Sequence, residues 1–180
     1  MSDYSLIMTA KQQAILDAAL QLFAREGYAG TATSKVAKTA GVSEGLIFRH
    51  FGNKQGLLDA ILEQGREHAK QAFAKVVMEA DPKKRIEKAL EVPYTINQRD
   101  YELWRLIYAI KWQTQQYDNS MYDPVRLVLT DAFKQLKYAD PKAETELLLM
   151  YLDGMATALL LHEPDNKAAI LEALKQKYDL

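Results

Sequence analysis

The segment around Gly41 has the spacing that a helix-turn-helix requires, and it constrains the fold more than any other part of the chain. Ala37 is small enough to let two helices touch, and Gly41 gives the backbone the freedom that a tight turn needs. Ile47 can anchor a second helix, for which Ser43 is a suitable N-cap. The pattern predicts two short helices, over 33–40 and 44–50.

The charge around these two helices differs from the charge of the whole chain. Residues 31–56 contain four basic side chains and one acidic side chain, whereas the chain of 180 residues has a net charge of −1. The basic residues are Lys35, Lys38, Arg49 and Lys54. A helix-turn-helix places its second helix in the major groove of DNA. Because salt screens the attraction between basic side chains and phosphates, these side chains must lie close to the DNA. The local charge therefore favours DNA as the partner.

The composition excludes several other classes of protein. The chain has no cysteine, so it cannot form disulfides or thiolate metal sites. Its most apolar run, 147–161, is too short to cross a bilayer and contains Asp153. No secretory signal is visible at the N-terminus. We expect a cytoplasmic protein that makes no membrane contact and needs no metal or cofactor.

The prolines mark where helices begin. Four of the five prolines follow an acidic residue, which suits an N-cap followed by the first helical position. This predicts helix starts near 82, 124, 141 and 164, whereas Pro93 is expected to break a helix. No strand-like alternation is present. The prediction is an all-α fold with about nine helices, over 9–25, 33–40, 44–50, 54–79, 83–92, 100–117, 124–137, 141–162 and 165–178.

These helices are expected to form two domains. Residues 1–52 would be a three-helix DNA-binding domain, and residues 53–180 a larger helical body. The long helix after Asn53 starts in the first domain and, at about 1.5 Å per residue, would extend roughly 35–40 Å into the second.

The stretch from Ala19 to Leu58 resembles the N-terminal signature of the TetR family of bacterial transcriptional regulators. It contains LFAREGY, VAKTAGVSEG and HFGNKQGLL in the order and spacing of that signature. The resemblance implies a homodimeric repressor that binds a palindromic operator and responds to a small molecule. The C-terminal body would dimerise and bind the effector, and effector binding would swing the long helix and change the separation of the two DNA-reading heads.

The resemblance also implies which residues contact DNA. Lys54 matches a lysine that grips a phosphate, and His50 matches a position that contacts the backbone. Phe48 replaces a frequent tyrosine and is expected in the core, while Ala32 replaces a frequent Ser or Thr and leaves the helix cap to Thr31 or Thr33. The predicted DNA-binding residues are Thr31, Thr33, Lys35, Ser43, Glu44, Gly45, Leu46, Arg49, His50 and Lys54.

An aromatic stripe stands out in the C-terminal body. Its members, spaced 3, 4 and 4 residues apart on one helix face, are Tyr101, Trp104, Tyr108 and Trp112. Such a stripe is either ordinary core or the wall of a cavity for a small molecule. His68, on the long helix, is a further candidate for effector contact.

A stripe of small and apolar residues in 141–162 suggests a dimer surface. Leu147, Gly154 and Ala158 share one arc of this helix. The last helix adds Ile170, Leu171 and Leu174, so we expect dimerisation through the last two helices. Burial of the same residues inside one subunit is the alternative.

Two other functions compete with the predicted regulator. An enzyme is disfavoured because the sequence has no glycine-rich phosphate loop, no HExxH and no convincing Ser-His-Asp set. A helical dimeric interaction module with vestigial DNA binding is the second alternative, and the basic patch argues against it.

Overall fold

The computed structural model describes residues 8–113, 120–162 and 164–180. Nine α-helices, three short 3-10 segments and no strand occur within these residues, which confirms the all-α prediction. The α-helices are α1 (Ala10–Glu26), α2 (Thr33–Ala40), α3 (Glu44–Phe51), α4 (Lys54–Val77), α5 (Pro82–Glu91), α6 (Tyr101–Gln113), α7 (Asp123–Gln135), α8 (Pro141–His162) and α9 (Lys167–Lys177). No helix in the described ranges is long and apolar enough to span a bilayer.

The chain packs as two compact units. The described residues of the first unit are 8–65 and 102–113, which comprise α1, α2, α3, the first half of α4 and nearly all of α6. The second unit contains the rest of the described chain. The predicted boundary at residue 52 differs from this division, in which the first unit continues to Gly65 and includes residues 102–113.

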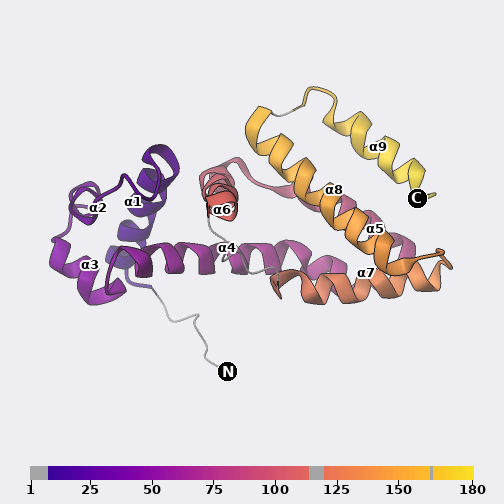
Figure 1. The fold of residues 1–180 in the computed structure, drawn as a ribbon, viewed down its shortest axis with the longest axis horizontal. Coiled ribbons are helices and arrows are strands. Elements are labelled where there is room, and N and C mark those ends of the chain that lie inside the picture. Colours follow the sequence, from indigo (N-terminus) through magenta and orange to yellow (C-terminus); the bar gives the residue numbers. More distant parts are fainter. Residues whose placement is uncertain (1–7, 114–119, 163) are drawn as a thin grey trace. The chain divides into compact units, whose positions relative to one another are not determined.

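Local signals fix the ends of α1. Its N-cap Thr9 forms a capping box with Gln12, in which each side chain bonds the backbone N–H of the other residue. At the other end Gly27 has a φ of 79°, a conformation that favours glycine, and the helix stops there. The chain then turns back so that α2 packs against α1 (Figure 1).

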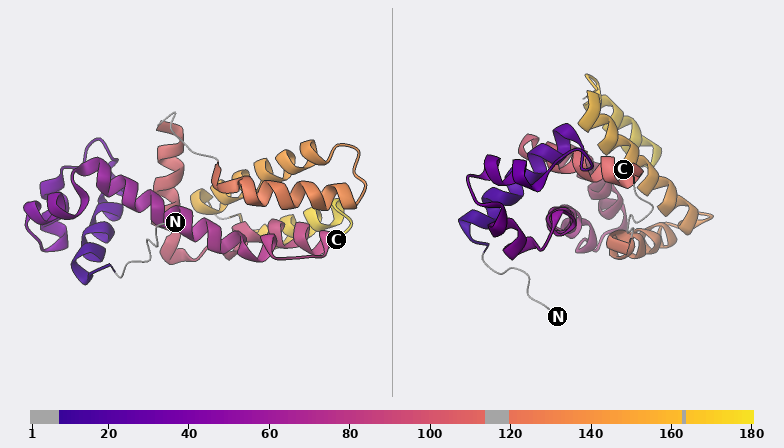
Figure 2. Two further views of the ribbon diagram at one scale, coloured as in Figure 1. Left: turned by 90° about the horizontal axis from the view of Figure 1, so that it is seen from below. Right: turned by 60° about the vertical axis from the view of Figure 1, so that its left-hand side comes forward.

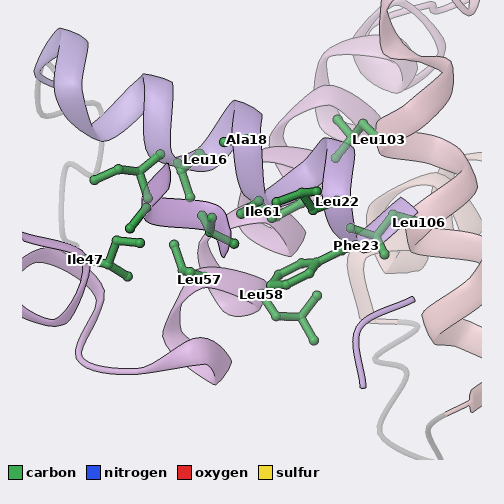
Figure 3. Close-up of a cluster of buried hydrophobic side chains, with 14 of the residues drawn as sticks. Leu16, Ala18, Leu22, Phe23, Ile47, Leu57, Leu58, Ile61, Leu103 and Leu106 are labelled. Carbon is green, nitrogen blue, oxygen red and sulfur yellow. The ribbon is translucent and has the colours of Figure 1, made fainter. Parts of the chain in front are cut away.

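One apolar cluster holds the first unit together (Figure 3). Phe23 of α1, Ile47 of α3 and Ile61 of α4 are almost completely buried in it. Leu103 and Leu106 bring α6 into the same cluster. The contact between α4 and α6 is close at Gly65, where a Cβ atom would lie 2.2 Å from Cδ1 of Ile107. The position of α6 therefore affects the core beneath the helix-turn-helix.

The second unit has its own core, formed by α5, α7, α8 and the second half of α4. Helices α7 and α8 form an antiparallel pair (Figure 2). Thr130 and Thr145 face each other in this pair, with their hydroxyl oxygens 2.9 Å apart. Phe133 and Leu148 are fully buried nearby. Leu171 and Leu174 of α9 pack against this core, which supports the alternative of intrasubunit burial for these two positions.

A buried arginine ties three elements of the second unit together. Arg85 of α5 is only 9% exposed, and its Nε donates to the Glu79 carbonyl oxygen at 2.8 Å, just after the end of α4. Its Nη1 donates to the carbonyl oxygen of Val128 in α7 at 3.0 Å. The charge is thus surrounded by acceptors, as a buried guanidinium requires.

The predicted helix starts are correct, to within one residue, at three of the four acid–proline pairs. Asp81 caps α5 by accepting from the Lys84 N–H at 2.9 Å, and Asp140 caps α8 by accepting from the Ala143 N–H at 3.0 Å. Helix α7 begins at Asp123, with Pro124 in its first turn and without a side-chain capping bond at its N-cap, Tyr122. Helix α9 begins at Lys167, three residues after Pro164, so the predicted start at 164 was wrong. Pro93 ends α5 but lies in a 3-10 segment, Val92–Thr95.

One face of α8 points away from the core and is apolar. Leu147, Met150 and Leu161 are 57%, 69% and 67% exposed, and nothing lies within 4 Å of where a Cβ of Gly154 would be. We call these four residues the α8 stripe. The helical spacing places all of them on one side.

Candidate nucleic-acid interface

The turn before α3 fixes how this helix is presented. Gly41 has φ 66° and ψ 34°, the left-handed conformation that glycine adopts readily. The N–H of Val42 donates to the Ala37 carbonyl oxygen at 3.0 Å, which closes α2 with a Schellman-type bond. Ile47 is completely buried and anchors α3 to the core. These features confirm the predicted helix-turn-helix geometry.

The opposite side of α3 faces away from the protein. Gly45, Phe48, Arg49 and His50 are all exposed, whereas Leu46 is half-buried against the core. Of the predicted groove-facing residues, the structure thus places Gly45 and Arg49 on the outer face. Leu46 lies at its margin.

Two cations of the helix-turn-helix are available to a partner. Lys38 of α2 and Arg49 of α3 are exposed, and neither forms a hydrogen bond or ion pair within the described chain. His50 follows Arg49 in the sequence and contacts the ring of Phe51 edge-on, with the centroids 6.2 Å apart. Guanidinium and ammonium groups without internal partners are suited to binding phosphate.

Lys54 is held in place at the start of α4. Its ammonium donates to the Ala29 carbonyl oxygen at 3.1 Å and lies 4.6 Å from the centroid of the Tyr28 ring. Tyr28 is oriented in turn because its hydroxyl donates to Oε1 of Gln55 at 2.9 Å. Burial, and secondarily the charge of Asp59, raises the pKa of Tyr28, so the phenol remains a donor. An ammonium has three protons, so Lys54 is positioned while retaining donors for a phosphate.

The charge of Lys35 is paired with a carboxylate of the same chain. Its ammonium contacts both carboxylate oxygens of Glu26 at 2.6 Å. Both side chains are largely exposed, and surface pairs of this kind contribute little to stability. Lys35 must leave Glu26 before it can bind a phosphate.

The three hydroxyl groups that were predicted to contact phosphate lie in different environments. Thr31 is 1% exposed and donates to the Gly27 carbonyl oxygen at 2.9 Å, which contradicts its predicted contact with phosphate. Thr33 donates to Oε1 of Glu44 at 2.6 Å and links the starts of α2 and α3. Ser43 is the N-cap of α3 as expected, but its hydroxyl forms no capping bond and is exposed.

Three other details were not anticipated. Phe48 is 45% exposed, so its expected place in the core was wrong. The N-cap of α2 is Ala32, without a side-chain capping bond, so neither Thr31 nor Thr33 caps this helix. The supporting role of Tyr28 was missed, although Tyr28 lies within the quoted LFAREGY segment.

The predicted effector residues lie outside the buried clusters. Tyr101, Trp104 and Tyr108 are half-buried on the side of α6 opposite Leu103 and Leu106, and the two clusters of the described residues do not include them. The side chain of Trp112 lies outside the described residues. His68 is 3.9 Å from Asp100, measured from Nδ1 to Oδ1.

Sequence comparisons agree with the helix-turn-helix. The family model described as bacterial regulatory proteins of the tetR family matches residues 15–61. The uncharacterized HTH-type transcriptional regulator YvkB of Bacillus subtilis is 51% identical over 57 residues, 32% of this chain and 30% of that protein. The HTH-type transcriptional repressor Rv3405c of Mycobacterium tuberculosis is 38% identical over 78 residues, 43% of this chain and 39% of that protein. The chain thus matches about a third of the length of these relatives.

Structural comparisons extend over nearly the whole chain. The TetR family regulator PfmR from Thermus thermophilus has a TM-score of 0.70 at 19% identity, covering 94% of this chain and 95% of that one. AibR, in complex with isovaleryl coenzyme A and operator DNA, has a TM-score of 0.70 at 20% identity, covering 92% and 96%. At this identity the likeness shows the fold alone. The helix-turn-helix of this chain, matched at residues 15–61, is therefore that of the tetR family of bacterial regulatory proteins, and the chain shares the fold of solved TetR regulators.

Proposed function

We propose that this protein is a cytoplasmic transcriptional repressor that binds a palindromic operator as a homodimer and is controlled by a small molecule. The observation that carries the proposal is the outer face of α3. This helix is anchored by Ile47 and presents Gly45, Phe48 and Arg49 to solvent, and the helices before and after it in the chain carry Lys38 and Lys54. Side chains on such a face can reach base edges in the major groove while the flanking cations bind phosphates.

A symmetric operator requires two copies of α3 at a fixed separation. The α8 stripe supports homodimerisation because it is an apolar surface left exposed by the subunit's own packing. Gly154 at its centre allows a second helix to approach closely. The same surface on both copies would form a two-fold interface, which matches the symmetry of a palindrome.

The effector site is proposed on the aromatic face of α6. Trp104 and Tyr108 are half-buried on this face, and the opposite face packs into the core of the DNA-binding unit through Leu103 and Leu106. The close contact between Gly65 and Ile107 leaves little freedom between α4 and α6. A ligand that shifts α6 would therefore disturb the core on which α3 rests.

Tryptophan fluorescence can test the effector site. The chain has two tryptophans, Trp104 and Trp112, and both lie in α6. A ligand bound at this face should change their emission at the same concentrations at which it releases the protein from operator. Isovaleryl coenzyme A and choline, named with two structures of this fold, are reasonable first probes. A compound that releases the operator without changing the emission would place the effector elsewhere.

DNA binding is tested by titrating labelled operator over a series of salt concentrations. The Arg49→Ala variant removes a cation that has no internal partner, so a change in affinity reflects DNA binding rather than altered structure. We expect affinity to fall about tenfold or more and the salt slope to decrease by about one for each phosphate that the variant no longer neutralises. Lys142→Ala, on the exposed start of α8, is the matched control and should bind like wild type.

The result of this titration distinguishes a sequence-specific regulator from an interaction module with vestigial DNA binding. An interaction module with vestigial DNA binding predicts weak affinity that is the same for all sequences and is unaffected by the Arg49 substitution. Named relatives such as the repressor Rv3405c support repression rather than activation.

A further inference from the structure

Two residues on the outer face of α3 are not explained by the fold. Phe48 leaves 45% of its side chain exposed, although burying a phenylalanine is among the larger gains available to a side chain. Gly45 lies within a helix, where glycine is less favourable than alanine. It has no positive φ, and nothing lies within 4 Å of where its Cβ would be. Neither the backbone nor the packing requires glycine there.

The two residues are neighbours on the helix surface. Gly45 and Phe48 are three residues apart, a spacing that brings side chains together on one face of a helix. Arg49 follows Gly45 by four residues and borders the other side of the same position. The result is a gap at Gly45 flanked by an exposed aromatic ring and an exposed guanidinium.

The chemistry of this face limits what can cover it. A phenylalanine ring cannot donate a hydrogen bond to phosphate, so a phosphate contact does not explain its exposure. Among the groups that base pairs present in the major groove, the 5-methyl group of thymine is the apolar one. A helix without a side chain at Gly45 can also approach the base edges more closely.

We propose that Phe48 contacts the 5-methyl group of one thymine in each operator half-site, and that Gly45 permits the close approach this contact needs. The inference rests on the proposed function, since it names a specificity determinant of that same interface. It predicts that the thymine is recognised by its methyl group rather than by hydrogen bonds from this side chain. Arg49, on the other flank, supplies attraction to the DNA.

Replacing thymine by deoxyuridine tests the contact, because it removes only the methyl group. Each thymine of an operator obtained by selection is replaced in turn, symmetrically in both half-sites, and affinity is measured by fluorescence anisotropy with the full-length protein. At one symmetric position we expect wild type to bind about 4-fold more weakly for each methyl group removed, or about 15-fold for both. Phe48→Ala should bind the thymine and deoxyuridine operators equally at that position.

Arg49→Ala is the control for this experiment. It should weaken binding to both operators by the same factor and so leave the ratio between them unchanged. If Phe48→Ala retains the wild-type ratio at every thymine, the assignment of Phe48 is overturned. If selection produces no preferred sequence, the proposed function fails, and the thymine contact fails with it.

Gly45→Ala tests the close approach separately. The added methyl group meets no protein atom and favours the helix, so thermal stability should be unchanged or slightly higher. Operator affinity should nevertheless fall about tenfold or more, because the methyl group projects toward the bases. Unchanged affinity would contradict the proposed approach.

Discussion

The Thr31 hydroxyl lies inside the protein, where it helps to fix the loop between α1 and α2. It donates to the Gly27 carbonyl oxygen at 2.9 Å, and its side chain is almost completely buried. Thr31→Val keeps the shape but removes the hydroxyl, so the free energy of unfolding should fall by about 1 kcal/mol in urea denaturation. Operator affinity of the folded protein should not change. Reduced affinity with unchanged stability would restore Thr31 to the DNA interface.

The carboxylate of Glu79, just after α4, makes the stability of the folded protein vary with pH in the acidic range. The pKa of Glu79 is lowered from 4.5 to about 2, chiefly by its bond with Lys88 and then by the backbone N–H groups of Asp81 and Ala80. A lowered carboxyl pKa stabilises the folded state above the ordinary pKa, and this contribution disappears as the pH falls from about 4.5 toward 2. The stability difference between wild type and Glu79→Gln should therefore shrink over that range. The exposed control Glu172→Gln should show no such trend.

At the level of elements, the junction between α3 and α4 is the tightest point of the DNA-binding unit. A Cβ atom on Gly56 would lie 1.8 Å from the Phe51 carbonyl oxygen, and backbone atoms cannot move aside easily. Gly56→Ala should therefore destabilise the protein by up to about 3 kcal/mol and weaken operator binding. Gly45→Ala, on the neighbouring helix, is the matched control for thermal stability alone, because its added methyl group has open space within the protein. Similar thermal stability of the two variants would show that the junction is not constrained in this way.

The elements also show how far the sequence could be interpreted. The helix-turn-helix was predictable because its signals are local: Gly41 at the turn, a small residue before it and Ile47 after it. The start of α9 was not, because Glu163-Pro164 resembles a helix start locally while the helix begins only at Lys167. The ion pair of Lys35 with Glu26 and the exposure of Phe48 depend on how α1, α2 and α3 pack, and the spacing of residues does not specify that.

At the scale of the whole molecule, the proposed dimer depends on the α8 stripe. Leu147→Glu places a charge within this apolar surface, where burial of an unpaired carboxylate is unfavourable. Sedimentation equilibrium should then show a monomer. Operator affinity should fall steeply, because each monomer carries a single α3 helix and can bind only one half-site. Met78→Glu, at an apolar residue that is 84% exposed outside α8, should remain dimeric. A dimer that survives the Leu147 substitution would place the interface on another surface.

Which helices pack together was harder to predict than which helices exist. The sequence assigned α6 to the C-terminal body, yet Leu103 and Leu106 belong to the core of the DNA-binding unit. Its aromatic and aliphatic faces were both recognised, but periodicity does not tell which neighbour covers each face. The same holds for α9, where Leu171 and Leu174, expected at the dimer surface, are half-buried against the core of their own subunit.

Selection of bound DNA from a random pool by the purified full-length protein tests the central claim most directly. If a dimer presents two α3 helices to successive turns of one face of the duplex, the enriched sequences should form a palindrome. Its half-site centres should lie about 10 base pairs apart, or a multiple of that distance. A single unrepeated half-site, or no enrichment of any sequence, would contradict the account.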